Sequence, residues 1–263
     1  MTVTGESDKL FSMGERNRST EAIILSVHEQ GENNRSVCAL SPENGIFYST
    51  LYGGPKSSLR SLVQPFNTGT IWLYDVPSKN SVKITDFDVK SCHLSFRVNL
   101  FKMWAANLAS ELIIKTHCAG ESKSAFILLK ALTDGMEKSD EKEARLGLLR
   151  FMWRYLSLLG LQPDVTECSV CSKKLLSEQK VFYSPETHSF LCSECFTQSN
   201  FNLNASGAAL TYLAAINTLS PKKVRTLSLT EEDVFELKKI LYFLIEEACS
   251  SPLQSIKSGA GIL

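Results

Sequence analysis

The sequence predicts an α+β protein, with a five-stranded barrel at the N-terminal end and a helical domain after it. Three observations predict this class. Short apolar runs separated by turn residues fill roughly the first 90 positions. From about residue 93, apolar residues recur every three or four positions, which is the period of an amphipathic helix. Two CxxC pairs then interrupt the helical part. We therefore expect a barrel over residues 1–90 and a helical domain over residues 91–263, with a cysteine module inserted at about 164–200.

The N-terminal runs are rich in β-branched and aromatic residues, as strands are. The turn at residues 41–45 contains an Asn-Gly step, which favours positive φ and therefore a hairpin. Five short strands of this spacing suit an OB-type barrel, although an SH3-like barrel would look much the same from sequence. The expected strands are residues 21–28, 35–40, 46–52, 70–76 and 82–89.

The helical part contains five expected helices. The third is apolar on most faces, which indicates the central helix of a bundle. It ends at Gly160, and Pro163 follows three residues later, as is usual after a helix C-terminus. Thr230 opens the last helix as an N-cap, with acidic residues in the first turn. The expected helices are residues 94–117, 124–136, 144–159, 205–219 and 230–249, with a loop at 137–142.

Four cysteines carry the strongest chemical signal. Cys168 and Cys171 form one pair and Cys192 and Cys195 the other, with 20 residues between the pairs. This spacing is typical of a zinc site, because a short hairpin can bring both pairs to one ion. Four thiolates complete a tetrahedral Zn²⁺, so we expect one structural zinc. The alternative is that the cysteines form two unrelated free pairs or disulfides. We expect His188, which lies inside the module, to be a surface residue rather than a ligand.

The remaining cysteines and the termini indicate the compartment. Cys38, Cys92, Cys118 and Cys249 have apolar neighbours and are expected to be small core residues in a reducing environment. The N-terminal residues lack the pattern of a secretory signal, and no run of 18 apolar residues predicts a transmembrane helix. We therefore expect a cytosolic protein without a membrane partner.

The charge is balanced, with 28 basic and 28 acidic residues. A nucleic-acid surface would therefore have to come from local clusters, and ordinary solvated charge is the alternative at every position. Aromatic residues that could stack on bases are Phe47, Tyr48, Tyr52, Trp72 and Tyr74, of which about half should face the barrel core. The candidate DNA contacts are Arg16, Arg18, Arg35, Lys56 and Arg60 in the barrel part, and Lys222, Lys223, Arg225, Lys238 and Lys239 in the helical part.

Catalytic motifs are missing from the sequence. It has no phosphate-binding glycine loop and no nucleophile elbow, and its four histidines form no metal-binding or nucleophile-pairing pattern. We therefore expect a protein that is not an enzyme. An adaptor whose zinc module and helices recruit partners, without strong DNA contact of its own, is an open alternative.

Several short motifs occur in order along the chain: residues 22–25 with 31–35, residues 52–56, residues 62–66, and residues 158–163 just before the first cysteine pair. Together they resemble the RecO family of bacterial recombination mediators over nearly the whole chain. The similarity implies an OB-fold fused to a helical domain with a structural zinc. It also implies DNA binding, annealing of complementary strands, and loading of recombinase onto DNA coated with single-stranded-DNA-binding protein. The implied partners are single- and double-stranded DNA, the acidic, hydrophobic C-terminal tail of that coating protein on the helical half, and the RecR mediator subunit at the barrel end. The implied location is the bacterial cytoplasm, at the nucleoid.

Overall fold

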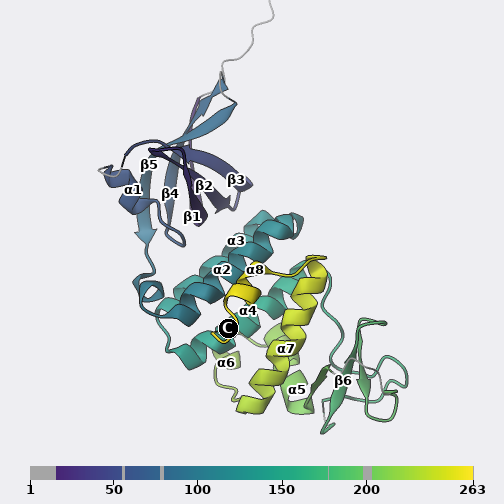
Figure 1. Cartoon of the computed structure of the whole chain (residues 1–263). Helices are drawn as coiled ribbons and strands as arrows, with labels where there is room; N and C mark the ends of the chain where they lie inside the picture. Colours follow the sequence, from purple (N-terminus) through teal and green to yellow (C-terminus); the bar gives the residue numbers. More distant parts are fainter. Residues whose placement is uncertain (1–15, 55–56, 78–79, 177, 198–202, 263) are drawn as a thin grey trace, which may run out of the picture.

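The computed structural model describes residues 16–54, 57–77, 80–176, 178–197 and 203–262. The barrel stands at one end of an elongated molecule, the helices form the middle, and the cysteine module lies at the far end (Figure 1). This arrangement confirms the predicted α+β class with a barrel followed by helices.

The barrel is closed, with strand order β1-β2-β3-β5-β4 and β4 pairing back to β1. Neighbouring strands are antiparallel except β3 and β5, which meet in parallel at Thr50 and Lys83. This order fits an OB-type barrel. The helix α1 (Ser58–Leu62) was not expected from sequence. The strands are β1 (Asn17–Gln30), β2 (Asn34–Ser41), β3 (Gly45–Leu51), β4 (Thr68–Val76) and β5 (Ser81–Ser91).

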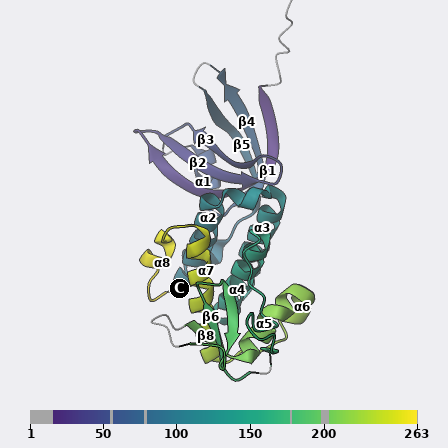
Figure 2. The same cartoon turned by 90° about the vertical axis from the view of Figure 1, so that its right-hand side faces the viewer.

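Strand β1 is buried on both faces. Ala22 and Ile24 contribute to the core of the barrel, whereas Ile23 and Leu25 belong to the large core shared with the helices. Strand β2 follows the same rule, with Cys38 and Leu40 on the helical side. The barrel therefore rests on α2 and α3 through the outer face of β1 and β2 (Figure 2).

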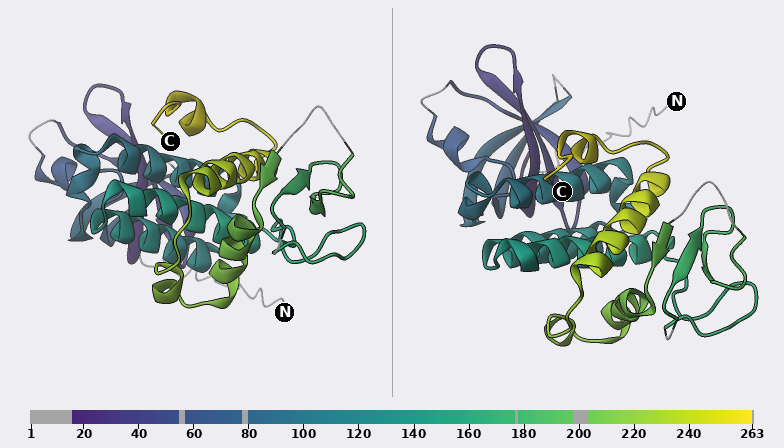
Figure 3. Two further views of the ribbon diagram at one scale, coloured as in Figure 1. Left: turned by 90° about the horizontal axis from the view of Figure 1, so that it is seen from below. Right: turned by 60° about the horizontal axis from the view of Figure 1, so that its bottom comes forward.

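The helical domain is built around α4 (Glu141–Leu158), whose Trp153 and Tyr155 are fully buried. Helix α7 packs across it (Figure 3), and its N-terminus has the predicted cap: Thr230 and Asp233 form a reciprocal capping box. No helix in the described ranges is long and apolar enough to cross a membrane. The other helices are α2 (Leu100–Lys115), α3 (Ser122–Glu137), α5 (Gly207–Thr218), α6 (Pro221–Val224), α7 (Glu231–Ala248) and α8 (Gln254–Ser258).

The predicted helix at 94–117 was wrong at its start. Residues Leu94–Arg97 form a separate 3₁₀ turn, η2, and the helix begins at Leu100 because the Asn99 side chain accepts a hydrogen bond from the Lys102 N–H. Val98, which matches the three-to-four-residue apolar period of the predicted helix, is 86% exposed. The predicted loop at 137–142 was too long, since α3 continues through Glu137 and α4 starts at Glu141.

A left-handed turn joins α2 to α3. Its four residues, His117–Gly120 (η3), have φ values of 49°, 60°, 54° and 74°. Three of the four carry a Cβ, so the turn is strained. It lies against the β2–β3 hairpin, where Cys118 contacts the backbone of Ile46. This turn is therefore part of the barrel–helix junction.

Candidate metal centre and binding surfaces

A three-stranded sheet carries the cysteine module. Strands β6 (Val181–Ser184) and β7 (Ser189–Cys192) form the hairpin expected between the two pairs, and β8 (Leu203–Ala205) adds a third strand to β6. Cys192 ends β7, so the hairpin delivers the second pair. The first pair is held in a tight loop, in which the Cys168 N–H donates to the Lys173 carbonyl at 2.8 Å.

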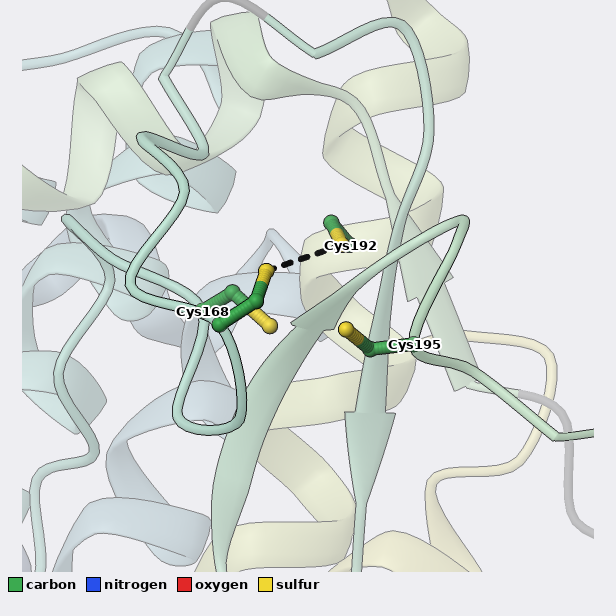
Figure 4. A group of neighbouring side chains, drawn as sticks. Cys168, Cys192 and Cys195 are labelled. Atoms are coloured by element: carbon green, nitrogen blue, oxygen red, sulfur yellow. Dashed lines mark hydrogen bonds between the residues drawn. The ribbon is translucent and has the colours of Figure 1, made fainter.

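The four cysteine sulfurs converge as the spacing predicts. The Sγ atoms of Cys168, Cys171, Cys192 and Cys195 all lie within 4.8 Å of one another. The Sγ atoms of Cys171 and Cys192 are 3.7 Å apart. Ligands at about 2.3 Å from a tetrahedral zinc ion are separated by roughly 3.8 Å, so the cluster fits this ion. Figure 4 labels Cys168, Cys192 and Cys195, whose sulfur atoms point toward one another.

The loop backbone favours a thiolate at Cys168. Burial opposes ionisation of Cys168, but hydrogen bonds from the N–H groups of Cys192, Cys171 and Val170 outweigh it and lower its pKa to about 6. A coordinating thiol must be deprotonated, so these donors prepare Cys168 for a cation. Hydrogen bonds with Cys171 and Cys192 instead raise the pKa of Cys195 to about 12. Four protein sulfurs leave no coordination position open, which makes a bound ion structural.

The other predictions about this region have mixed outcomes. His188 is exposed, as expected, and its Nδ1 atom lies 3.4 Å from Glu247 Oε2. Cys38 and Cys118 are buried and Cys249 is half-buried, but the prediction for Cys92 was wrong, because this side chain is exposed at the end of the barrel. Cys92 directly follows β5, where the chain leaves the sheet for the helical domain.

Most of the arginines predicted to bind DNA at the barrel are held by carboxylates. Glu29 bonds both Arg35, at 3.0 Å, and Arg60, at 2.8 Å. Arg18 lies 3.6 Å from Asp75. Arg16 is exposed, and Lys56 lies outside the described residues. The structure thus brings Arg35 and Arg60 together, but around an acid that the sequence analysis did not include.

The basic residues of the helical part separate into two places. Lys222 and Lys223 are exposed on α6, and Arg225, directly after this helix, lies 3.7 Å from Glu143. Lys238 and Lys239 lie on α7 with their ammonium groups 5.7 and 4.0 Å from the centre of the Phe235 ring. The ten candidates therefore form several small groups.

A groove of about 800 Å³, which no sequence pattern predicted, lies between α3, α4 and α6. Its apolar lining includes Leu128, Leu132 and Phe151, and Gly135 and Gly147 leave parts of the two long helices bare. The apolar period of a sequence cannot predict such a groove, because the groove depends on how two helices pack against each other. We call it the arginine groove, after the three arginines that line it: Arg150, Arg154 and Arg225.

Positive charge exceeds negative charge at one end of the arginine groove. Glu143 is shared by Arg150 and Arg225, and Arg150 also donates to the Tyr212 hydroxyl at 2.9 Å. Arg154 has no ion-pair partner in the described part of the chain. Burial, together with the neighbouring Arg150 and Arg225, lowers its pKa. An anion placed here would relieve this repulsion.

A closed barrel, a helical domain and a four-cysteine cluster define a two-part protein with a metal-binding module. Family models support this division: "Recombination protein O N terminal" matches residues 14–92 and "Recombination protein O C terminal" matches residues 97–256. The chain therefore belongs to the RecO family, and this membership supports a role in recombinational DNA repair.

Curated relatives agree with the family models. The chain is 24% identical to the DNA repair protein RecO of Bacillus pumilus over 241 residues, which cover 90% of this chain and 91% of that one. It is 25% identical over 228 residues to the protein of the same name from Desulforamulus reducens, covering 86% and 87% of the two chains. The similarity thus extends over both halves.

Proposed function

We propose that this protein is a recombination mediator in DNA repair. In this role it binds single- and double-stranded DNA, anneals complementary strands, and helps load recombinase onto strands coated with single-stranded-DNA-binding protein. It works in the bacterial cytoplasm at the nucleoid, without catalysing a reaction. Family membership supports the repair role, and the arginine groove is the observation that supports the loading step.

We assign separate roles to the two halves of the chain, with the domain boundaries expected from the sequence. Residues 1–90 contact DNA and, at the barrel end, the RecR subunit; residues 91–263 hold the coating protein. One structural zinc, bound by Cys168, Cys171, Cys192 and Cys195, orders the module at about 164–200. The convergence of the four sulfurs supports this assignment.

The acidic, hydrophobic tail of the coating protein fits the arginine groove. Such a tail needs an apolar groove with a cation at its rim. Leu128, Leu132 and Phe151 supply apolar surface, and Arg154 is a cation that no carboxylate within the described residues neutralises. Both main walls, α3 and α4, lie in the segment of residues 91–160, which has ten basic against seven acidic residues.

A calorimetric titration with the synthetic tail peptide tests the loading step. Arg154→Gln should weaken binding by about tenfold or more, since a charge-assisted hydrogen bond contributes roughly 1.5–3 kcal/mol. Arg97→Gln, at an exposed arginine that does not line this groove, is the matched control. Equal affinity of Arg154→Gln and the parent, or no binding at low salt, would remove this assignment.

Strand annealing tests the DNA half of the proposal. The purified protein should speed duplex formation between complementary single strands. The ion pairs of Arg18, Arg35 and Arg60 favour the alternative of a zinc-containing adaptor with weak DNA contact. Tail binding without any annealing would establish that alternative.

A further inference from the structure

The packing of the barrel limits where a strand of nucleic acid can lie. The outer face of β1 and β2 is buried against the helices through Ile23, Leu25 and Leu40. The opposite side of the barrel, where β5 lies between β3 and β4, faces away from the helical domain (Figure 2). The helices α2 and α3 leave this side uncovered, although α1 packs against β5, so it is available to a ligand of the barrel.

Three aromatic residues and a lysine occupy this side. Trp72 and Tyr74 alternate on β4 with Ile71 and Leu73, which fill the barrel core, so both aromatic rings face outward. Lys83 lies opposite Tyr74 across β4 and β5. Its ammonium nitrogen lies 5.8 Å from the centre of the Tyr52 ring, just beyond β3. Trp72 is 38% exposed.

We propose that these four residues, Tyr52, Lys83, Tyr74 and Trp72, form an aromatic strip on which the barrel stacks the bases of a single strand. The inference rests on the proposed DNA binding and names the surface that performs it. Every base has a π-face, so a strip of aromatic rings binds strands with little sequence preference. Lys83, between two of the rings, is placed to contact the backbone of the strand.

The chemistry of the strip favours nucleic acid over a protein partner. Alongside Trp72, Tyr74 and Lys83, the outward positions of β4 and β5 include Thr70, Thr85, Asp86, Asp88 and Lys90, and Val76 at the end of β4 is the aliphatic side chain among them. Protein interfaces use aromatic residues too, but their centres are depleted of charge, whereas Lys83, Asp86 and Asp88 lie among these rings. Planar rings flanked by a cation suit bases.

Charges around the strip are close to balance. Asp86 lies opposite Trp72, and its Oδ1 atom accepts a hydrogen bond from the Phe87 N–H at 2.8 Å. Asp75 is paired with Arg18, while Arg16 and Lys83 add positive charge. Stacking rather than phosphate contact must therefore dominate. Each phosphate of a single strand that the protein neutralises contributes roughly −0.7 to the slope of log association constant against log salt concentration. For this surface we therefore expect a slope of only about −1.

Tryptophan fluorescence gives a direct readout. The chain has three tryptophans; Trp153 is fully buried and Trp104 is partly buried against the helical core. Adding an oligothymidylate to the zinc-loaded full chain should quench the emission of Trp72. Trp72→Phe should abolish this quenching, and Trp104→Phe should retain it.

Affinity measurements provide the second test. Trp72→Ala and Tyr74→Ala should each weaken binding of the oligothymidylate between about fivefold and a hundredfold, the range for loss of one stacked base. Tyr48→Ala is the matched control, because Tyr48 is 62% exposed but its neighbour across the sheet is Cys38, on the helical side of the barrel.

The outcomes separate this inference from the proposed function. If the parent protein binds no oligothymidylate, the proposed DNA binding fails as well. If the parent binds, but Trp72→Ala and Tyr74→Ala bind equally well and quenching persists in Trp72→Phe, the strand lies elsewhere and only the aromatic strip is refuted. Metal content and circular dichroism of each variant establish that it is folded.

Discussion

His93 and Asp134 connect the barrel to the helices. The Nε2 atom of His93 lies 2.9 Å from Oδ1 of Asp134 on α3, and its Nδ1 atom lies 2.9 Å from the carbonyl oxygen of Phe66 in the barrel half. The His93 side chain is only 1% exposed. Ser91 and Lys130 bond the same carboxylate at 3.1 Å each. One carboxylate thus fixes the segment that joins the two halves.

Replacing His93 should loosen this junction. His93→Ala leaves Phe66 and Asp134 without their shared partner, so we expect a loss of about 1–3 kcal/mol in the free energy of unfolding. Urea denaturation measures it. His28→Ala, at an exposed histidine of β1, is the control and should change stability by less than about 0.5 kcal/mol. Equal effects of the two substitutions would show that the junction does not depend on His93.

The Asp134 carboxylate should make the free energy of unfolding depend on pH under acidic conditions. Burial alone would raise its pKa, but hydrogen bonds from His93 and Lys130 outweigh burial and lower it. A carboxyl whose pKa is lower in the folded state stabilises the fold above its unfolded pKa of about 3.9 and loses this contribution as pH falls further. Urea midpoints measured from pH 6 to pH 3 should therefore fall less steeply for Asp134→Asn. Parallel curves for parent and variant would exclude this role.

Removing one ligand of the metal centre should release the ion. The purified protein should hold one zinc per chain, and Cys168→Ser should lose it and lower the free energy of unfolding by roughly 3–5 kcal/mol, because the ion orders the loops. Cys92→Ser, at an exposed cysteine outside the cluster, should retain the metal. Metal analysis of the parent and both variants tests this prediction. A parent protein that holds no zinc and has eight freely titratable thiols would contradict it.

Strain in the left-handed turn should be relieved by glycine. Ala119 has φ 54° and ψ 22°. Ala119→Gly should raise the free energy of unfolding by about 0.5–1 kcal/mol, since relief of strain exceeds the added freedom of the unfolded chain. Ala131→Gly, at an exposed position within α3, should instead lower it by about 0.5–1 kcal/mol. Thermal denaturation of both variants is the test, and a destabilised Ala119→Gly would contradict it.

Gly147 offers a way to separate stability from binding. A Cβ built there meets Arg150 at 3.8 Å and Leu132 at 3.9 Å, which is ordinary contact. Gly147→Ala should stabilise α4 by about 0.5–1 kcal/mol. The added methyl group should also narrow the arginine groove and lower the affinity for the tail peptide severalfold. Ala119→Gly, which changes stability far from the groove, should bind the peptide normally. Unchanged peptide affinity in Gly147→Ala would place the tail elsewhere.

The sequence predicted the elements well where a local pattern specifies them. The five strands lie close to the expected runs, and Thr230 begins its helix as expected, because turn residues and caps act within a few positions. The error at residue 94 has a local cause as well. Leu94 and Val98 match the helical period, but the true start signal is Asn99, which accepts the Lys102 N–H as an N-cap.

The binding surfaces were less accessible to sequence reasoning. The cysteine cluster was found because both CxxC pairs are local motifs joined by one hairpin. Glu29 meets Arg60, and Arg154 meets Arg225, only after distant segments pack, and no spacing rule reports such pairs. One signal was available: residues 22–25 are a continuous apolar run, which indicates a strand buried on both faces rather than one with a solvent side.

The double burial of β1 and β2 means that the two halves are not independent modules. Cutting the chain near residue 92, where the two family models divide it, would uncover Ile23, Leu25 and Leu40 on the barrel and the matching surface on α2 and α3. Such an apolar surface makes a fragment prone to self-association. The boundary between the two family models therefore does not separate two independently folding units, because the barrel and the helices share one apolar core.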